Sequence, residues 1–94
     1  MQPGAGAVLR PREVIWREVS GEMVILDQDG GRIFGLNASG GHMWRLLDGR
    51  RSLTDIAAEL ASHFAIPHER AERDVVALAG QLVDRGLADI ISRG

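Results

Sequence analysis

The pattern of apolar residues changes at Asn37 from the spacing of strands to that of helices, and this change constrains the fold most. Three segments rich in aliphatic and β-branched residues precede it, at 13–19, 22–27 and 32–36. Ser20-Gly21 and Asp29-Gly30 separate them and are typical of the turns that join hairpin strands. The sequence therefore predicts a three-stranded antiparallel meander in which 32–36 is an outer strand.

The part of the chain after Asn37 carries the signals of three helices. Asn37 and Ser52 have side chains that can accept hydrogen bonds from the free amides of a first helical turn, and Asp55 follows Ser52 as in a capping box. Pro67 suits the first turn of a further helix, and glycine at positions 49 and 86 is typical of helix ends. The helices are therefore expected at 38–48, 53–64 and 67–86, with a last short strand at 87–91.

A chain of 94 residues supports one domain. A domain of this size buries only about 60–65% of its unfolded surface, which leaves little room for an enclosed active site. The first nine residues are rich in glycine, so a flexible tail is expected over 1–9 and the domain over 10–91. The expected fold is α+β and winged-helix-like, with a three-stranded antiparallel N-terminal sheet followed by three helices.

Composition excludes several classes of protein. The chain has no cysteine, which excludes disulfides, thiolate metal sites and a cysteine nucleophile. No apolar run approaches the roughly 18 residues that span a membrane, and the N-terminus lacks the features of a secretory signal. A cytoplasmic monomer without a membrane partner is therefore expected. Trp16 and Trp44 are expected in the core, because a small core with few aromatic residues needs their bulk.

The sequence contains no recognisable catalytic or metal-binding arrangement. His42, His63 and His68 are its only histidines, and the last two, five residues apart across a proline, do not share a helical face. Residues 27–31 begin like a calcium loop, but the carboxylate required at the twelfth position is missing. Ser39 does not lie in the Gly-x-Ser-x-Gly motif of hydrolases. We therefore expect neither an enzyme nor a bound metal or cofactor.

The helix expected at 67–86 has a wider apolar face than a small domain needs. At 100° per residue its apolar side chains fill an arc of about 180°, whereas a stripe of about 100° or more is typical. These side chains are Val75, Val76, Leu78, Ala79, Leu82, Val83 and Leu87. Asp74, Gln81 and Arg85 line one border of the arc. Two interpretations remain open: either two neighbours pack this helix at once, or part of the arc faces a groove.

The winged-helix-like order raises a DNA-binding regulator as an alternative. A DNA reader of this size neutralises phosphates with clustered Arg and Lys. The net charge here is −2, the helix at 53–64 has no Arg or Lys, and the helix at 67–86 is net acidic. The sequence therefore favours a partner other than nucleic acid.

Three stretches of the chain together resemble the PqqD-like family of leader-peptide recognition domains. They are VILDQDGGRIFGLNASGGHMWRLLDG, SLTDIAAELASHF and ERDVVALAGQLVDRGL. The resemblance covers roughly residues 10–90, and its most specific part is GRIFGLN leading into MWRLLDG. The other specific part is the spacing of Asp74, Val75, Leu78, Leu82, Gly86 and Leu87. Members of the family serve pathways that modify ribosomally made peptides, including pyrroloquinoline quinone synthesis and lasso-peptide maturation.

The resemblance implies a non-catalytic adaptor that binds the leader of a precursor peptide and presents it to a modifying enzyme, such as a radical enzyme or a leader peptidase. In the family, the leader adds as a strand to the third strand and lies against the third helix. Strand 32–36 has one charge and no proline to block its edge. The candidate peptide-binding residues are Arg32, Ile33, Phe34, Gly35, Leu36, Asp74, Val75, Leu78, Gln81, Leu82 and Arg85.

Alternation along strand 32–36 is expected to place Phe34 and Leu36 toward the core and the groove, and Ile33 on the opposite face. Gly35 would let another backbone come close. The apolar floor of the groove is expected to consist of Phe34, Val75, Leu78 and Leu82. Asp74 and Arg85 are expected on one rim.

Overall fold

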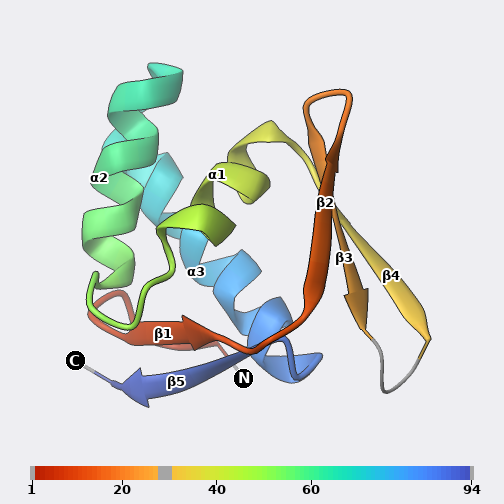
Figure 1. The fold of residues 1–94 in the computed structure, drawn as a ribbon. Helices are drawn as coiled ribbons and strands as arrows, with labels where there is room; N and C mark the ends of the chain where they lie inside the picture. The colour runs from red at the N-terminus through yellow and green to blue at the C-terminus, as the bar shows by residue number, and fades with distance from the viewer. Residues whose placement is uncertain (1, 28–30, 94) are drawn as a thin grey trace.

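The computed structural model describes residues 2–27 and 31–93 (Figure 1). The elements, in chain order, are β1 (Val8–Pro11), β2 (Ile15–Val19), β3 (Glu22–Asp27), β4 (Arg32–Leu36), α1 (Ala38–Leu46), α2 (Leu53–Phe64), α3 (His68–Asp84) and β5 (Ala88–Ser92). No helix in this part of the chain is long and apolar enough to span a bilayer. The Asp-Gly turn expected at 29–30 lies outside the described residues.

The strands of the described residues form two antiparallel sheets. β2, β3 and β4 pair in that order as a meander, in which Ile25 of β3 lies opposite Phe34 of β4. β1 and β5 form a second, two-stranded sheet, in which Leu9 lies opposite Ile90. The three segments predicted as a meander therefore pair with one another. The prediction of one N-terminal sheet followed by helices was incomplete, because the second sheet joins segments from the two ends of the chain.

The N-terminal segment is part of the packed structure, so the prediction of a flexible tail over 1–9 was wrong for residues 5–9. Ala7 and Leu9 are fully buried, and Val8 begins β1. The amide of Leu53 donates to the carbonyl of Ala7 at 2.9 Å. The glycine-rich composition suggested disorder, but β5 and the start of α2 provide partners that lie far away in the sequence.

The three helices begin where their capping residues predict. Asn37 Oδ1 accepts a hydrogen bond from the amide of Gly40 at 2.9 Å, and Ser52 forms a complete capping box with Asp55. Pro67 is the N-cap of α3, without a side-chain hydrogen bond. α1 and α3 each end two residues before the predicted limit, so Gly49 and Gly86 lie shortly after the helix ends and outside the helices.

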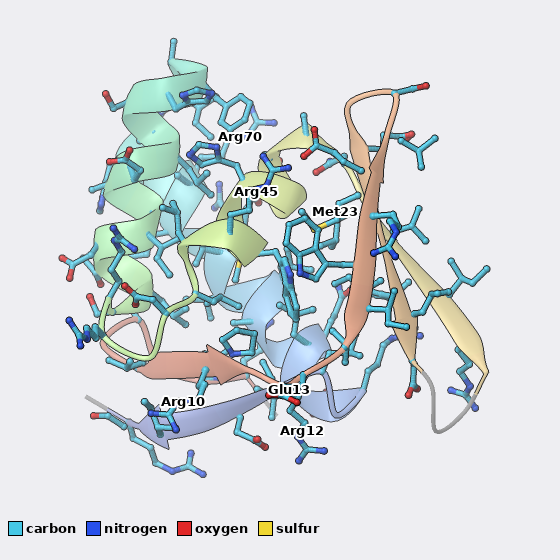
Figure 2. The ribbon with its side chains drawn as sticks, in the orientation of Figure 1. Arg10, Arg12, Glu13, Met23, Arg45 and Arg70 are labelled. Atoms are coloured by element: carbon cyan, nitrogen blue, oxygen red, sulfur yellow. The ribbon has the colours of Figure 1, made fainter. Side chains whose placement is uncertain are left out.

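The core lies between the helices and the inner faces of both sheets. Met23 points from β3 toward α1 (Figure 2), and Ile25 on the same strand is fully buried. The remaining large buried side chains are Leu9, Leu36, Met43, Trp44, Leu47, Leu53, Ile56, Leu60, Val75, Leu82 and Leu87. Trp44 thus occupies the core as predicted.

Trp16 does not lie in the core, and that prediction was wrong. Its side chain is 39% exposed, although its register partner Ile25 is fully buried. β2 is an outer strand, and all five of its residues are exposed. The guanidinium of Arg45 lies 5.7 Å from the centre of the Trp16 ring and also pairs with Glu18. Bulk and hydrophobicity therefore did not place this ring in the core, because on the outer strand β2 it is covered only in part.

Two glycines let α1 lie directly against the three-stranded sheet. A Cβ at Gly41 would lie 3.3 Å from the Cβ of Met23, and a Cβ at Gly40 would lie 3.3 Å from the Cβ of Leu36. Glycine inside a helix costs about 1 kcal/mol relative to alanine, and the close packing of the helix on β3 and the end of β4 offsets this cost. The chain consequently passes from β4 into α1 with only Asn37 between them.

An exposed ion pair connects the segment after β1 to β5. Arg12 donates to both carboxylate oxygens of Asp89, at 3.0 and 2.8 Å. These hydrogen bonds hold the pKa of the Asp89 carboxyl below its usual value. Because the pair is exposed, the buried residues of β1 are expected to contribute more to stability than this contact does.

The buried position of Leu9 gives a first testable prediction. Leu9→Ala should lower the free energy of unfolding by about 2–5 kcal/mol, since it removes fully buried methyl groups and leaves a cavity. The matched control is Leu26→Ala, which removes the same atoms from a side chain that is 36% exposed and should cost clearly less. Urea unfolding of both variants measures the difference. Equal losses would show that residues 5–9 are not part of the cooperative core.

Candidate functional site

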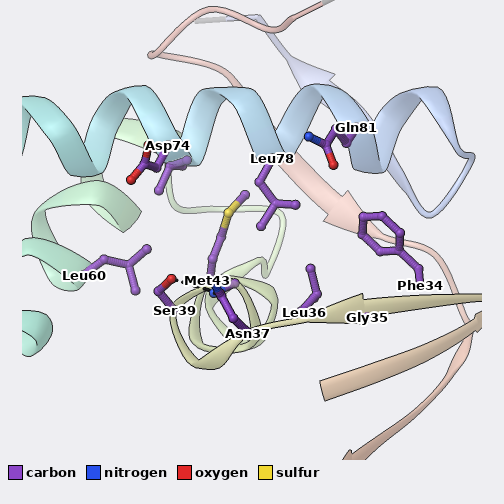
Figure 3. A pocket seen from close by; sticks show the side chains of 12 residues that line it. Phe34, Gly35, Leu36, Asn37, Ser39, Met43, Leu60, Asp74, Leu78 and Gln81 are labelled. Atoms are coloured by element: carbon purple, nitrogen blue, oxygen red, sulfur yellow. Dashed lines mark hydrogen bonds between the residues drawn. The ribbon is translucent and has the colours of Figure 1, made fainter. Parts of the chain in front are cut away.

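A groove separates β4 from α3 (Figure 3). Its volume is about 320 Å³, which is at the small end of the range for ligand pockets. β4, α1, α2 and α3 all contribute to its lining. The lining residues are Phe34, Gly35, Leu36, Asn37, Ser39, Gly40, Met43, Leu60, Asp74, Val75, Leu78 and Gln81.

The groove runs beside a strand edge that has no partner strand among the described residues. β4 is last in the order β2-β3-β4 and pairs with β3 only on its other side. In an antiparallel ladder, alternate residues direct both their N–H and C=O groups away from the paired neighbour. An edge of this kind is a template for another strand unless charge, proline or a covering element blocks it. Arg32 is the single charged residue of β4, so the edge is poorly protected.

The side chains of β4 alternate as predicted. Leu36 is buried, and Phe34 is half-buried against the core and lines the groove. Ile33 is 68% exposed and does not line the groove. A Cβ at Gly35 would meet no atom within 4 Å, which leaves the backbone open at that position. The groove is therefore bounded on this side by two apolar side chains and a bare stretch of backbone.

α3 forms the opposite wall. Asp74, Val75, Leu78 and Gln81 line the groove from this helix, and Figure 3 shows Leu78 pointing into it between Asp74 and Gln81. Leu82 was predicted in the apolar floor of the groove, but it is fully buried in the core and does not line the groove, so it supports this wall from within.

Arg85 closes the groove beside Phe34. It is the C-cap residue of α3, and its guanidinium carbon lies 4.9 Å from the centre of the Phe34 ring. A cation placed over an aromatic face is attracted by the ring's electrons. Seven of the eleven predicted residues line the groove, and Arg85 lies beside it against Phe34, whereas Arg32, Ile33 and Leu82 do not line it. The seven are Phe34, Gly35, Leu36, Asp74, Val75, Leu78 and Gln81.

Five lining residues were not predicted. Asn37, Ser39, Gly40 and Met43 come from the start of α1 and the residue before it, and Leu60 comes from α2. Asn37 was predicted as a helix cap, which is correct, and Leu60 lies on the buried face of α2. Their second role depends on how α1 and α2 pack beside α3, which no local pattern reveals.

The polar groups of the groove do not form a catalytic arrangement that we recognise. The hydroxyl of Ser39 donates to Asn37 Oδ1 at 3.1 Å, so it serves the helix cap. Elsewhere, the rings of His42 and His63 stack with their centres 4.4 Å apart. Within residues 2–27 and 31–93, no group of three or more His, Cys, Asp or Glu is placed to hold a metal ion. The groove offers apolar surface, backbone hydrogen bonds and two side-chain charges.

The sequence of this groove and its walls matches one family. The model of the family described as coenzyme PQQ synthesis protein D (PqqD) matches residues 22–88. The chain belongs to the PqqD family. The match begins at the first residue of β3 and ends at the first residue of β5. It thus includes both β4 and α3 of the groove.

The chain is also similar to a relative that is named as a binding protein. The chain is 36% identical over 56 residues to the PqqA binding protein of Gluconobacter oxydans (strain 621H). That alignment covers 60% of this chain and 58% of the relative. The chain thus matches somewhat more than half the length of this relative.

Two solved structures have the same fold. The PqqD truncation of Methylobacterium extorquens PqqCD, described as a recognition element for ribosomally synthesised and post-translationally modified peptides, superposes with a TM-score of 0.76 at 24% identity. That match covers 92% of this chain and 93% of the other. TbiB1 in complex with the TbiA(beta) leader peptide gives a TM-score of 0.71 at 22% identity, with 95% of each chain covered. At these identities the likeness establishes the shared fold.

The different burial of two leucines on α3 leads to a second prediction. Leu82→Ala should cost about 2–5 kcal/mol of unfolding free energy, because Leu82 is fully buried. Leu78→Ala removes the same atoms from the half-buried side chain that lines the groove and should cost clearly less. Chemical denaturation of the two variants measures this difference. A larger loss for Leu78→Ala would mean that the groove is closed and packed in solution.

Proposed function

We propose that this PqqD-family chain binds the leader segment of a ribosomally made precursor peptide and presents it to a modifying enzyme. The observation that carries the proposal is the juxtaposition of the unpaired edge of β4 with the apolar wall of α3. An extended peptide can add to such an edge through main-chain hydrogen bonds, while pockets for alternate side chains provide selectivity. We place the leader antiparallel to β4, with one face against α3.

Each part of the groove has a role in this proposal. The outward backbone groups of β4 pair with the peptide backbone, and Gly35 allows close approach. Leu78 and Phe34 contact apolar side chains of the leader, with Val75 beneath them. Met43 and Leu60 extend the apolar surface at the end nearest α1 and α2. The side chains of Arg32 and Ile33 do not line the groove, and of these two adjacent residues only the one whose backbone groups point away from β3 can pair with the peptide.

The proposed role is that of an adaptor without catalytic activity of its own. The names of the relatives refer to binding and recognition. The modifying enzyme would act in trans on the bound precursor, in a pathway for pyrroloquinoline quinone or for a lasso-type peptide. A radical enzyme or a leader peptidase is the kind of enzyme that such a pathway contains. A short precursor gene next to the gene for this chain would support the assignment.

A carrier that must also release its cargo needs intermediate affinity. A leader that is disordered when free loses conformational entropy on binding, and this offsets part of the contact energy. Dissociation constants between micromolar and nanomolar, roughly −8 to −12 kcal/mol, suit such a role.

No specific observation favours the alternative of a winged-helix DNA-binding regulator. α2 contains no Arg or Lys, and α3 carries more acidic than basic residues. A helix that enters a DNA groove needs positive charge to neutralise phosphates. The exposed face of α3 that borders the groove offers apolar side chains and Asp74 instead.

A titration followed by amide chemical shifts tests the proposed function. With the leader encoded beside the gene, shifts should concentrate on 31–37 and 71–86. Leu78→Arg should abolish them, because it places a charge on the apolar wall, while the spectrum of the free variant stays that of a folded protein. Shifts that map to α2 instead, or normal binding by the variant, would contradict the proposal.

The matched control is Ile33→Arg. It introduces the same side chain on β4, at a position that is 68% exposed and faces away from the groove. This variant should bind the leader as the unmodified protein does. If it fails to bind while remaining folded, the leader lies on the outer face of the sheet.

A further inference from the structure

The groove carries opposite charges at its two ends. Figure 3 shows Asp74 at the end where Ser39 and Leu60 lie, and Gln81 at the end where Phe34 lies. Arg85 occupies the second end, with its guanidinium carbon 4.9 Å from the centre of the Phe34 ring. On α3, Leu78 and then Gln81 line the groove between the two charges, and Leu78 provides the apolar contact. A bound strand therefore meets negative charge at one end and positive charge at the other.

We infer that the groove selects a leader segment with a basic residue on its N-terminal side and an acidic residue four or six positions later, with a large apolar residue between them. This inference rests on the proposed function. β4 runs from Phe34 toward Leu36 and α1, whereas α3 runs from Asp74 toward Arg85. A peptide antiparallel to β4 consequently has its N-terminal side beside Asp74 and its C-terminal side beside Arg85.

The spacing follows from the geometry of the two elements. Asp74 and Arg85 are eleven residues apart in the sequence, which is about 16 Å at the helical rise of 1.5 Å per residue. A strand rises about 3.3 Å per residue, so this distance corresponds to about five strand residues. Only every second residue of the peptide faces α3. The basic and the acidic residue of the peptide must therefore be four or six positions apart. Leu78 lies about 6 Å beyond Asp74, so the apolar residue comes two positions after the basic one.

Both charges are available to a peptide. Asp74 approaches Arg70 at 3.9 Å, and both side chains are about two-thirds exposed. An exposed ion pair with so long a distance is weak, so a cationic side chain of the peptide can take the place of Arg70 as the partner of Asp74. The guanidinium of Arg85 lies over the Phe34 ring, and its N–H groups can still donate to a carboxylate. The two ends together therefore orient the peptide, because a reversed peptide would bring like charges together.

Two synthetic peptides of identical composition test this inference. In the forward peptide, lysine precedes leucine by two positions and glutamate by six, with threonine elsewhere. In the reversed peptide, lysine and glutamate are exchanged. We expect the protein to bind the forward peptide on the order of fivefold more tightly, as two partly exposed ion pairs would give. Fluorescence anisotropy of labelled peptides measures both dissociation constants.

A double variant makes the test sharper. Asp74→Arg combined with Arg85→Glu exchanges the two charges without changing the net charge, and should reverse the preference. The matched control exchanges two charges on exposed residues of α3 that do not line the groove, Glu69→Arg with Arg73→Glu, and should keep the original preference. A nitroxide at the N-terminus of the forward peptide should broaden the amides near Asp74 more than those near Arg85.

The outcomes separate this inference from the proposed function. If both peptides bind equally well and Leu78→Arg still abolishes binding, the charge inference is wrong. The proposed peptide-binding function of the groove is then still supported. Binding of neither peptide overturns the charge inference, and the titration with the encoded leader then decides the proposed function by itself. Peptide binding that is insensitive to Leu78→Arg overturns both. A preference for the forward peptide that the double variant retains also overturns the inference, because other groups would then set the direction.

Discussion

The close packing of α1 on the three-stranded sheet is the contact on which the groove depends. Gly41 brings the helix backbone against Met23 of β3, and Gly40 does the same for Leu36 at the end of β4. α1 therefore occupies the space between the end of β4 and α3, and Met43 fills the core at that point. Along the rest of β4 the groove separates the strand from α3, and no strand among the described residues pairs with its outer edge. An apolar groove with an unpaired backbone edge is the result.

This arrangement explains the wide apolar arc of α3. Val75, Ala79 and Leu82 are buried in the core, whereas Leu78 is half-buried and faces the groove. Both interpretations of the arc thus describe part of the helix. The buried side holds α3 in place, and the other side is free for a ligand. A small domain can in this way offer binding surface without enclosing a cavity.

Local signals in the sequence predicted the parts of the fold that depend on local interactions. Helix starts follow from side chains such as Asn37 and Ser52, which bond to amides three residues away. The meander follows from short turns and apolar segments. Position in three dimensions decided the failures: Trp16 is exposed because β2 is an outer strand, and Ala7 is buried because the start of α2 and β5 lie beside it. The same limit applies to the groove, where Met43 and Leu60 could not have been found without the packing of α1 and α2.

Hydrogen exchange of the β4 amides tests most directly whether a leader adds to this edge. Alternate residues of β4 direct their amides away from β3, so these amides should exchange quickly in the free protein and slowly once a leader peptide pairs with them. The amides that already bond to β3 should change little, which provides an internal reference. The proposal predicts this alternating protection within 32–36. Uniform exchange of β4 with bound leader, together with protection elsewhere, would contradict strand addition.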